Sequence, residues 1–330
     1  MASTQLTRTP SSNGNDKTAT LSLWFKRNKI DGTQQNLFTS SPTSERTQIF
    51  ITTDETLHIQ AYVSSSATTN VITNRKFRDT NAWYHLVIAF DTTQSSASDR
   101  IKVYVNGVQE TSFGTNTRQG QNGSLSFNQS SRTVTIGNYL SGSYYFKGLM
   151  SHIHWIDGTQ YAASDFGETD STTGEWKIKT SPSVTYVTNG FFLLKDDNAV
   201  TDRSGQGNNF TLSGTLSKTE DNPSNVFCTI NNITLPAAQV NIGYGATAKT
   251  NTPTTNAWRS FYGTLGASSG KYYFEMKVNN IENTDPNNFW VGIVDAEQMT
   301  DTANNNLFQN LARGYGYHAK TGSSGYNNNT

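Results

Sequence analysis

The chain has 330 residues, of which 34% are hydrophobic, 12% aromatic and 15% charged, and its formal net charge at pH 7 is zero. Its aromatic content is too high for a disordered chain, and without a basic stripe it lacks the electrostatic footprint of a nucleic-acid-binding protein. It also has no apolar run long enough to span a membrane as a helix. Ser, Thr, Asn and Gly are abundant instead, as is typical of strands with hydroxyl-rich outer faces joined by turns.

The sequence carries contradictory signals about cellular location. Cys228 is the only cysteine, so no disulfide can form within the chain, and residues 1–5 are polar, without the apolar core of a signal peptide. The surface chemistry is nevertheless typical of extracellular proteins. A protein made in a host cytoplasm and released by lysis, as virion proteins are, reconciles these signals. Composition leaves a cytosolic β protein equally open.

Alternating patterns predict strands along most of the first 220 residues. In residues 57–63, for example, apolar side chains alternate with His58, Gln60 and Tyr62, as in a strand with one buried face. Asn106-Gly107 favours the type I′ turn of a tight hairpin. Strands are predicted within residues 18–26, 36–39, 48–52, 57–63, 81–91, 100–110, 132–137, 146–157 and 190–194.

The remaining segments have turn chemistry or weak helical character. We expect a Gly/Asn/Gln-rich loop at 114–123, an aromatic loop at 138–145, one helical turn at 161–166 and a glycine-rich bend at 202–210. Long helical periodicity is absent, and short strands separated by turns favour an all-β, antiparallel jelly-roll sandwich.

A polar segment at 219–223 breaks this pattern, and we place a domain boundary there. The first expected domain is residues 1–222, the jelly roll. The second, residues 223–330, is expected to be a partial β-sandwich with strands at 271–278 and 289–294.

Five blocks in the first region resemble the concanavalin A-like, laminin-G-like jelly rolls. The resemblance implies that fold for most of residues 18–167. The blocks are Thr20-Leu21-Ser22-Leu23-Trp24-Phe25-Lys26, Trp83-Tyr84-His85-Leu86-Val87-Ile88-Ala89-Phe90-Asp91, Val103-Tyr104-Val105-Asn106-Gly107, Thr135-Ile136-Gly137 and Phe146-Lys147-Gly148.

A narrower resemblance links the chain to jelly rolls of tailed phages, marine and cyanobacterial ones especially. It implies a virion fibre or surface protein. The phrases that carry it are Leu6-Thr7-Arg8-Thr9-Pro10-Ser11-Ser12-Asn13-Gly14-Asn15, Ile156-Asp157-Gly158, Phe166-Gly167-Glu168-Thr169-Asp170 and Ser204-Gly205-Gln206-Gly207-Asn208-Asn209-Phe210-Thr211.

The second region resembles the start of a SPRY domain. Ser269-Gly270-Lys271-Tyr272-Tyr273-Phe274-Glu275 and Trp290-Val291-Gly292-Ile293 carry the similarity. A SPRY domain continues with a Gly-Asp strand turn and an Asn-Gly hairpin, which this sequence lacks. Because half a sandwich would leave strand edges unpaired and its core open, we expect the natural protein to be longer than the given sequence; completion by another chain is the alternative.

Two kinds of reactive centre can be weighed from the sequence. A glycosidase needs two carboxylates flanking the scissile bond, and the nearest match to a glucanase motif, Glu168-Thr169-Asp170, lacks a third acid at the right spacing. We therefore expect no enzymatic activity. His152 and His154 share a predicted strand face, but a third zinc ligand is missing.

No cofactor is expected, although Ca²⁺ stays open. Laminin-G-like domains often hold this ion at the sheet rim, and four predicted strand ends carry an aspartate: Asp54, Asp91, Asp99 and Asp157. Many relatives have Asp-Glu where this sequence has Ser151-His152, which weakens the support for a calcium site.

Sugar binding is the remaining chemistry that the sequence favours. Aromatic faces stack on sugar rings, and amide groups bond their hydroxyls. The candidate carbohydrate-binding residues are Asn138, Tyr139, Tyr144, Tyr145 and Trp155. The alternative is that Tyr144 and Tyr145 cap the core or pack on a neighbouring subunit.

Together, these patterns predict a non-enzymatic virion surface protein of a tailed phage: a fibre, spike or decoration subunit on the capsid or tail. Its expected partners are other virion proteins, further copies of itself and host cell-surface polysaccharide, with no nucleic acid and no membrane insertion. A carbohydrate-binding module of a larger adhesin or glycan-active enzyme is the alternative, and a glucanase is a third reading.

Overall fold

The protein is represented by a computed structural model that describes residues 4–41, 44–139, 144–195, 200–231, 240–243, 248–251, 261–277, 290–295, 297, 314–318 and 324–327. The chain folds as two compact units, Met1–Val226 and Phe227–Thr330, so the division lies four residues after the expected boundary. No helix among the described residues is long and apolar enough to cross a membrane.

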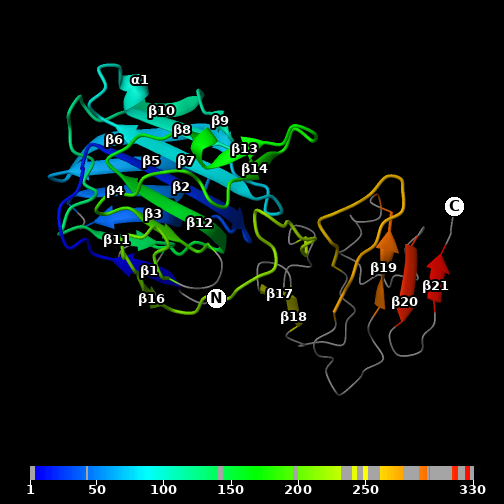
Figure 1. Ribbon diagram of the computed structural model, residues 1–330. Helices are drawn as coiled ribbons and strands as arrows, with labels where there is room; N and C mark the ends of the chain where they lie inside the picture. Colours follow the sequence, from blue (N-terminus) through cyan, green and yellow to red (C-terminus); the bar gives the residue numbers. More distant parts are fainter. Residues whose placement is uncertain are drawn as a thin grey trace. The chain divides into compact units, whose positions relative to one another are not determined.

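One layer of the first unit is an eight-stranded antiparallel sheet in the order β10-β6-β5-β4-β3-β11-β1-β16 (Figure 1). Its strands are β1 (Gln5–Arg8), β3 (Gln35–Ser41), β4 (Arg46–Ile51), β5 (Thr56–Val63), β6 (Ser66–Lys76), β10 (Phe113–Thr117), β11 (Thr133–Ile136) and β16 (Thr211–Ser213).

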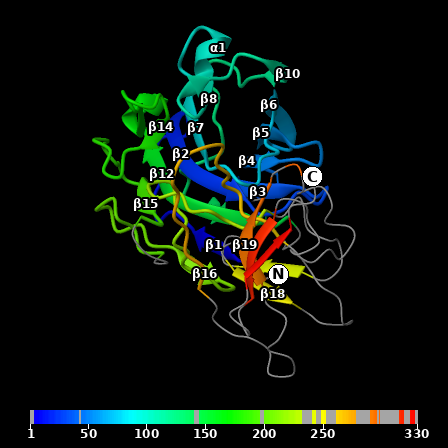
Figure 2. The same ribbon diagram turned by 90° about the vertical axis from the view of Figure 1, so that its right-hand side faces the viewer.

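The second layer is a six-stranded antiparallel sheet in the order β15-β12-β2-β7-β8-β9. The two sheets form separate layers that face each other (Figure 2). The strands are β2 (Thr18–Arg27), β7 (Tyr84–Asp91), β8 (Ile101–Val105), β9 (Val108–Gln109), β12 (Gly148–Asp157) and β15 (Phe191–Leu193). This arrangement confirms the all-β, antiparallel sandwich that the alternating patterns predict.

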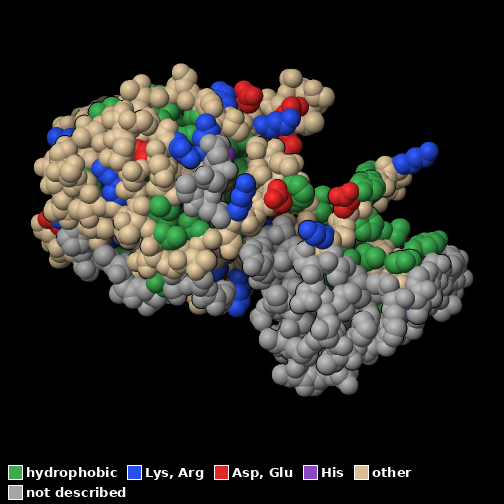
Figure 3. All heavy atoms as spheres, turned by 60° about the horizontal axis from the view of Figure 1, so that its bottom comes forward, with side chains coloured by type: hydrophobic (Ala, Val, Ile, Leu, Met, Phe, Trp, Pro, Cys, Tyr) green, Lys and Arg blue, Asp and Glu red, His purple; other side chains and the backbone are tan. Residues whose placement is uncertain are grey.

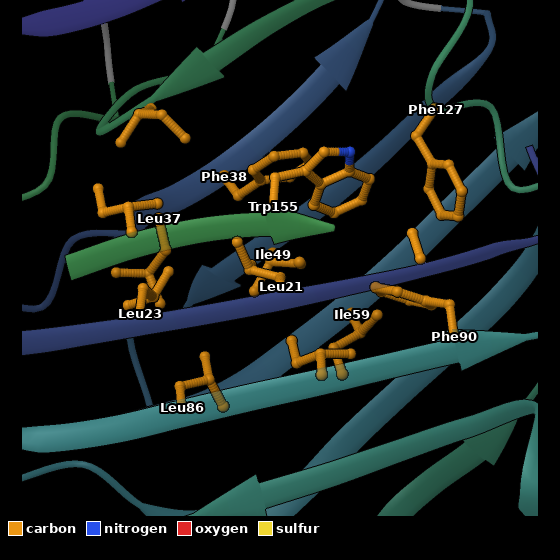
Figure 4. Close-up of a cluster of buried hydrophobic side chains, with 14 of the residues drawn as sticks. Leu21, Leu23, Leu37, Phe38, Ile49, Ile59, Leu86, Phe90, Phe127 and Trp155 are labelled. Carbon is orange, nitrogen blue, oxygen red and sulfur yellow. The ribbon is translucent and has the colours of Figure 1, made fainter. Parts of the chain in front are cut away.

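The apolar side chains of both sheets meet between the layers (Figure 4). Leu21, Leu23 and Phe25 of β2 are fully buried, as their alternation predicts. On β3 a bulge between Asn36 and Phe38 turns two consecutive residues, Leu37 and Phe38, into the core. Each fully buried Leu or Phe side chain stabilises the fold by roughly 1.5–3 kcal/mol relative to leaving it exposed.

The sequence pattern misses β6 and wrongly assigns β10 to a loop. In β6 the inward positions hold Thr69 and Thr73 on either side of Val71, and all three are buried. The Thr73 hydroxyl accepts a hydrogen bond from the Leu57 amide at 3.1 Å. Threonine therefore fills core positions here, which removes the apolar alternation that would have marked the strand.

Short elements complete the first unit. The Asn106-Gly107 turn between β8 and β9 has positive φ at both residues, 48° and 81°, as a type I′ turn requires. A helical turn, α1 (Ala97–Arg100), precedes β8, and the predicted turn at 161–166 contains the 3₁₀ turn η1 (Ala163–Asp165).

The hairpin of β13 (Gly167–Thr169) and β14 (Trp176–Ile178) packs against the six-stranded sheet. A Cβ atom added at Gly107 or at Gly167 would lie within 2.5 Å of the Trp176 indole. The indole thus lies between two glycines, with its N–H bonded to His85 on β7 at 2.9 Å. The hairpin thus covers His85, whose ring in turn bonds Ser22 and stacks on Trp24 on the polar face of β2.

The described parts of the second unit form a hairpin and a small sheet. The hairpin is β17 (Val240–Gly243) with β18 (Ala248–Asn251), and the sheet is β19 (Trp290–Val294), β20 (Gly314–His318) and β21 (Ser324–Asn327). The strand predicted at 271–278 is absent from residues 271–277, and Val278 lies outside the described residues. Tyr272 and Tyr273 there are 74% and 82% exposed, so no sheet buries the alternating face.

Candidate functional site

Two of the predicted sugar-binding tyrosines lie together on the surface. The ring centroids of Tyr139 and Tyr144 are 6.1 Å apart, and Tyr144 is 39% exposed. The Arg46 guanidinium lies 3.7 Å from the ring centroid of Tyr62 and 5.9 Å from that of Tyr139. These four residues, Arg46, Tyr62, Tyr139 and Tyr144, are called the aromatic cluster below.

Hydrogen bonds hold the described ends of the 138–145 loop on the outer face of β3. The Tyr144 carbonyl accepts from the Asn36 amide at 3.1 Å and from the Asn36 side chain at 3.3 Å. The Asn138 carbonyl accepts from the Thr39 hydroxyl at 3.4 Å, and the Asn138 side chain donates to Gln5 at 2.7 Å. The loop therefore reaches the aromatic cluster across the sheet, while residues 140–143 lie outside the described residues.

The other predicted residues occupy different environments. Trp155 is 1% exposed and stacks on Phe38 in the core, with centroids 4.8 Å apart (Figure 4). Its expected role in sugar binding is wrong because the indole faces the opposite sheet, and its N–H is bonded to Asn128 at 2.7 Å. Asn138 is also buried, and its carbonyl and side-chain amide hold the loop on the sheet. Tyr145 is half-buried.

A row of uncharged polar residues crosses the outer face of the whole eight-stranded sheet. The strand registers place its members directly opposite one another, so all point to the same side. This "polar row" consists of Thr117 (β10), Asn70 (β6), Gln60 (β5), Gln48 (β4), Thr39 (β3), Thr135 (β11), Thr7 (β1) and Thr211 (β16).

The exposure of the polar row differs along its length. Gln48 is 4% exposed, and Thr39 and Thr135 are buried, in the region where Asn138 and Tyr144 are bonded to β3. Gln60 and Asn70 are half-buried and Thr117 is exposed. The accessible part of the row on β5, β6 and β10 lies next to Tyr62 of the aromatic cluster, and the covered centre separates it from Thr7 and Thr211 at the other end, which are half-buried and exposed. Below, "the accessible part" means Gln60, Asn70 and Thr117.

The accessible side chains can form hydrogen bonds to a ligand without carrying charge. The Gln60 side chain donates to the Asn70 side-chain oxygen at 3.3 Å. Among the described residues, the side-chain oxygen of Gln60 and the side-chain NH₂ group of Asn70 make no hydrogen bond. Amides and hydroxyls in such an arrangement can both donate and accept. Figure 3 shows a first unit on whose visible surface charged side chains are scattered among uncharged ones.

Asp170 of the Glu168-Thr169-Asp170 motif lies in a turn and is bonded by protein groups. Asp170 accepts from the amides of Thr172 and Thr173 and from Lys177, 2.6 Å away. The pKa of Asp170 lies well below its usual range, and the largest cause of this shift is the hydrogen bond from Lys177. Asp170 therefore stays ionised and closes a turn, which leaves it unable to donate a proton as a general acid.

The part of the chain that the structure describes contains no group of three or more His, Cys, Asp or Glu side chains that could hold a metal ion. His152 and His154 are both buried. A bulge between Ser151 and His154 interrupts the register. His154 stacks on Phe192 at 3.9 Å and contacts the Tyr186 hydroxyl at 2.5 Å.

The rim aspartates are also engaged by protein groups. Asp157 accepts from the amide of Asn15, the side chain of Asn128 and the amide of Asn189. Asp91 accepts from Thr93 and Gln94. Asp54 accepts from Thr52 and Thr56, and Asp99 pairs with Lys102 at 3.2 Å.

His85 is a buried neutral imidazole. The Trp176 indole can only donate, so His85 Nδ1 is the acceptor and Nε2 carries the proton, which it donates to Ser22 at 2.9 Å. Burial lowers the pKa of His85 to about 3. Burial also lowers the pKa of His154.

We expect His85 to make the first unit less stable in mild acid. The pKa of His85 is ordinarily 6.5 and is about 3 in the folded protein. Between these pH values His85 is protonated in the unfolded chain but not in the folded one, so the free energy of unfolding decreases as the pH is lowered. From pH 8 to pH 5 the free energy of unfolding should drop by about 2 kcal/mol from this residue.

Urea unfolding at pH 8, 6 and 5 measures this drop, with His85→Gln as the comparison. The variant is expected to start lower, because it loses packing against Trp24, but to depend less on pH. An equal pH dependence in both proteins would contradict the assignment.

The first unit is similar to a known family and to several solved structures. The family model of the concanavalin A-like lectin/glucanases superfamily matches residues 2–182, just over half of the chain. Among curated proteins, none matches the sequence.

Three solved structures illustrate the similarity. The native heptameric SAP-like pentraxin from Limulus polyphemus has 16% identity over 48% of this chain and 71% of its own, with a TM-score of 0.36. Domains LG4-5 of the mouse laminin alpha1 chain have 9% identity over 58% of this chain and 44% of their own, with a TM-score of 0.35. The Ruminococcus gnavus IT-sialidase CBM40 has 12% identity over 48% of this chain and 94% of its own, with a TM-score of 0.34.

Proposed function

Given that the chain belongs to the concanavalin A-like lectin/glucanases superfamily, we propose that its first unit binds glycans without hydrolysing them. The site is the aromatic cluster together with the accessible part of the polar row. The observation that carries this proposal is that aromatic rings and uncharged hydrogen-bonding groups lie on one sheet face, with Tyr62 and Gln60 two residues apart on β5.

This combination suits sugars for a physical reason. A sugar ring has an apolar face, which an aromatic ring can cover, and a rim of hydroxyls, which amides and hydroxyls can bond. The Arg46–Tyr62 stack holds the Tyr62 ring in place, because a cation over a ring face is worth about 0.5–2 kcal/mol. A pre-positioned ring loses less conformational entropy when a ligand arrives.

Replacement of Tyr62 tests the site. On a glycan array we expect the wild-type protein to bind a subset of glycans with sub-millimolar affinity. Tyr62→Ala should weaken that binding about tenfold, equivalent to about 1.4 kcal/mol. Tyr273→Ala is the matched control, because Tyr273 is an exposed tyrosine of the second unit. Wild-type silence on the array, or equal loss in both variants, would contradict the proposal.

The absence of hydrolysis is tested separately. Asp170 closes a turn and pairs with Lys177, which supports a non-catalytic role. Incubation with β-glucans should release no reducing sugar. Release that disappears in Glu168→Gln would make the protein a glucanase instead.

The biological setting that we propose is the virion surface of a tailed phage. The chain would act there as a fibre, spike or decoration subunit, associate with other virion proteins and with its own copies, and attach to host polysaccharide. The support is the similarity of the sequence motifs at 6–15, 156–158, 166–170 and 204–211 to those of phage jelly rolls. A role as a carbohydrate-binding module of a larger adhesin or enzyme is the alternative.

Mass spectrometry of purified particles from the source phage separates these settings. Detection of this chain at a fixed copy number supports the virion role. Its absence from particles, with glycan binding retained, favours the module of an adhesin or enzyme. The SPRY-like second domain remains part of this proposal, since the described strands of the second unit are few.

A further inference from the structure

We propose that the glycan is an extended, uncharged polysaccharide that lies across the strands and contacts the protein through three consecutive sugar units. This inference rests on the proposed glycan-binding function and adds the class of ligand, its direction and its length. It follows from the register of the polar row, which is independent of the aromatic cluster.

The register places one hydrogen-bonding residue on each strand, in line. Gln60 is opposite Asn70, and Asn70 is opposite Thr117, so β5, β6 and β10 present one group each in sequence. Neighbouring strands lie about 4.8 Å apart, a distance close to the length that one hexopyranose ring adds to an extended polysaccharide. Successive sugar units can therefore meet successive strands.

The accessible part of the row sets the length. On one side the row ends at β10, the edge strand of the sheet, which carries Thr117. On the other side Gln48 of β4 is covered. Three accessible positions remain between these limits, with Tyr62 beside the first of them on β5. A chain longer than three units gains no further member of the row.

The chemistry of the row sets the class. Every member carries a hydroxyl or a carboxamide, so the row offers hydrogen bonds but no charge to an acidic sugar. The Arg46 guanidinium beside this part of the face stacks on Tyr62. A neutral hydroxyl-bearing chain is the ligand that these groups match.

The test uses gluco-, xylo- and manno-oligosaccharides of one to six units as probes, measured by calorimetry with the full chain. In at least one series we expect affinity to rise at least tenfold from one unit to three, and less than threefold from three units to six. Equal affinity for one and six units would indicate a site for a terminal sugar and would overturn the inference.

Two variants of the same row locate the third unit. Thr117→Ala should weaken binding of three-unit and longer oligosaccharides about three- to tenfold and leave two-unit binding unchanged. Thr211→Ala is the matched control: it is exposed, lies in the same row and is separated from Thr117 by the covered centre. Equal loss in both variants, or loss at every length in Thr117→Ala, would overturn the assigned direction.

The outcomes distinguish this inference from the function on which it rests. Binding on the array only to acidic or branched glycans, with none to the three series, would overturn the inference and leave glycan binding intact. Silence on both the array and the series would remove both. Circular dichroism of each variant shows that its fold is retained, which is expected because both threonines are exposed on edge strands.

Discussion

Trp155→Ala should lower the free energy of unfolding of the first unit by about 4–8 kcal/mol. Truncating a buried tryptophan leaves a cavity and typically costs about 3–5 kcal/mol. A second cost arises because the indole N–H is bonded to Asn128, and an unsatisfied buried acceptor costs about 1–3 kcal/mol. Since domains are stable by only about 5–15 kcal/mol, this loss is a large fraction of the total stability.

The effect should spread beyond the cavity, because Asn128 connects three segments. Its side chain also donates to the Asn15 carbonyl and to Asp157, at 2.7 and 2.9 Å. Urea unfolding followed by near-ultraviolet dichroism measures the loss. Trp155→Phe, which keeps most of the volume and removes the N–H, should lose about 1–3 kcal/mol. A loss below 1 kcal/mol in Trp155→Ala would contradict the buried position.

Asp221→Ala should be the second most damaging substitution considered, with a loss of about 3–5 kcal/mol. Lys26 of β2 and Asp221 form an ion pair at 3.0 Å in which both side chains are 0% exposed. Removing the carboxylate leaves the Lys26 ammonium group buried from solvent without this counter-charge. The ion pair ties residues 219–223, where the sequence suggested a boundary, to the six-stranded sheet.

The double variant Lys26→Met with Asp221→Leu distinguishes this cause from a general loss of packing. Replacing both charges by apolar groups is often nearly neutral, so the double variant should be much more stable than Asp221→Ala. Lys102→Met is a surface control: its partner Asp99 is 46% exposed, and such pairs contribute about 0–1 kcal/mol. A double variant as unstable as the single one would refute the explanation.

The fold was largely predictable because most core strands carry a clean period-2 pattern. The Leu21-to-Phe25 alternation in β2 and the Asn-Gly turn after β8 each have one local physical cause. Where the pattern failed, the cause was not local. β6 uses Thr69 and Thr73 at core positions, and the hydroxyl of Thr73 accepts from the Leu57 amide on the neighbouring strand and donates to the Arg75 carbonyl of its own strand.

The candidate site was predictable only in part. The aromatic character of Tyr139 and Tyr144 is visible in the sequence, but their neighbours Arg46 and Tyr62 come from strands 77 to 98 residues earlier. Trp155 follows the loop closely and still faces the core, because strand residues alternate between faces. The polar row could have been suspected from the outward positions of 57–63, yet its continuity depends on registers between strands.

The order of strands at one edge of the large sheet has a mechanical consequence. β1 pairs with β16 so that Gln5 is opposite Ser213, and the chain enters and leaves this ladder at the same end. A load pulling the N-terminus away from the chain that follows Ser213 therefore opens the ladder one hydrogen bond at a time, like a zipper. The Lys26–Asp221 pair lies on the loaded side, and we expect it to give way before the strands separate.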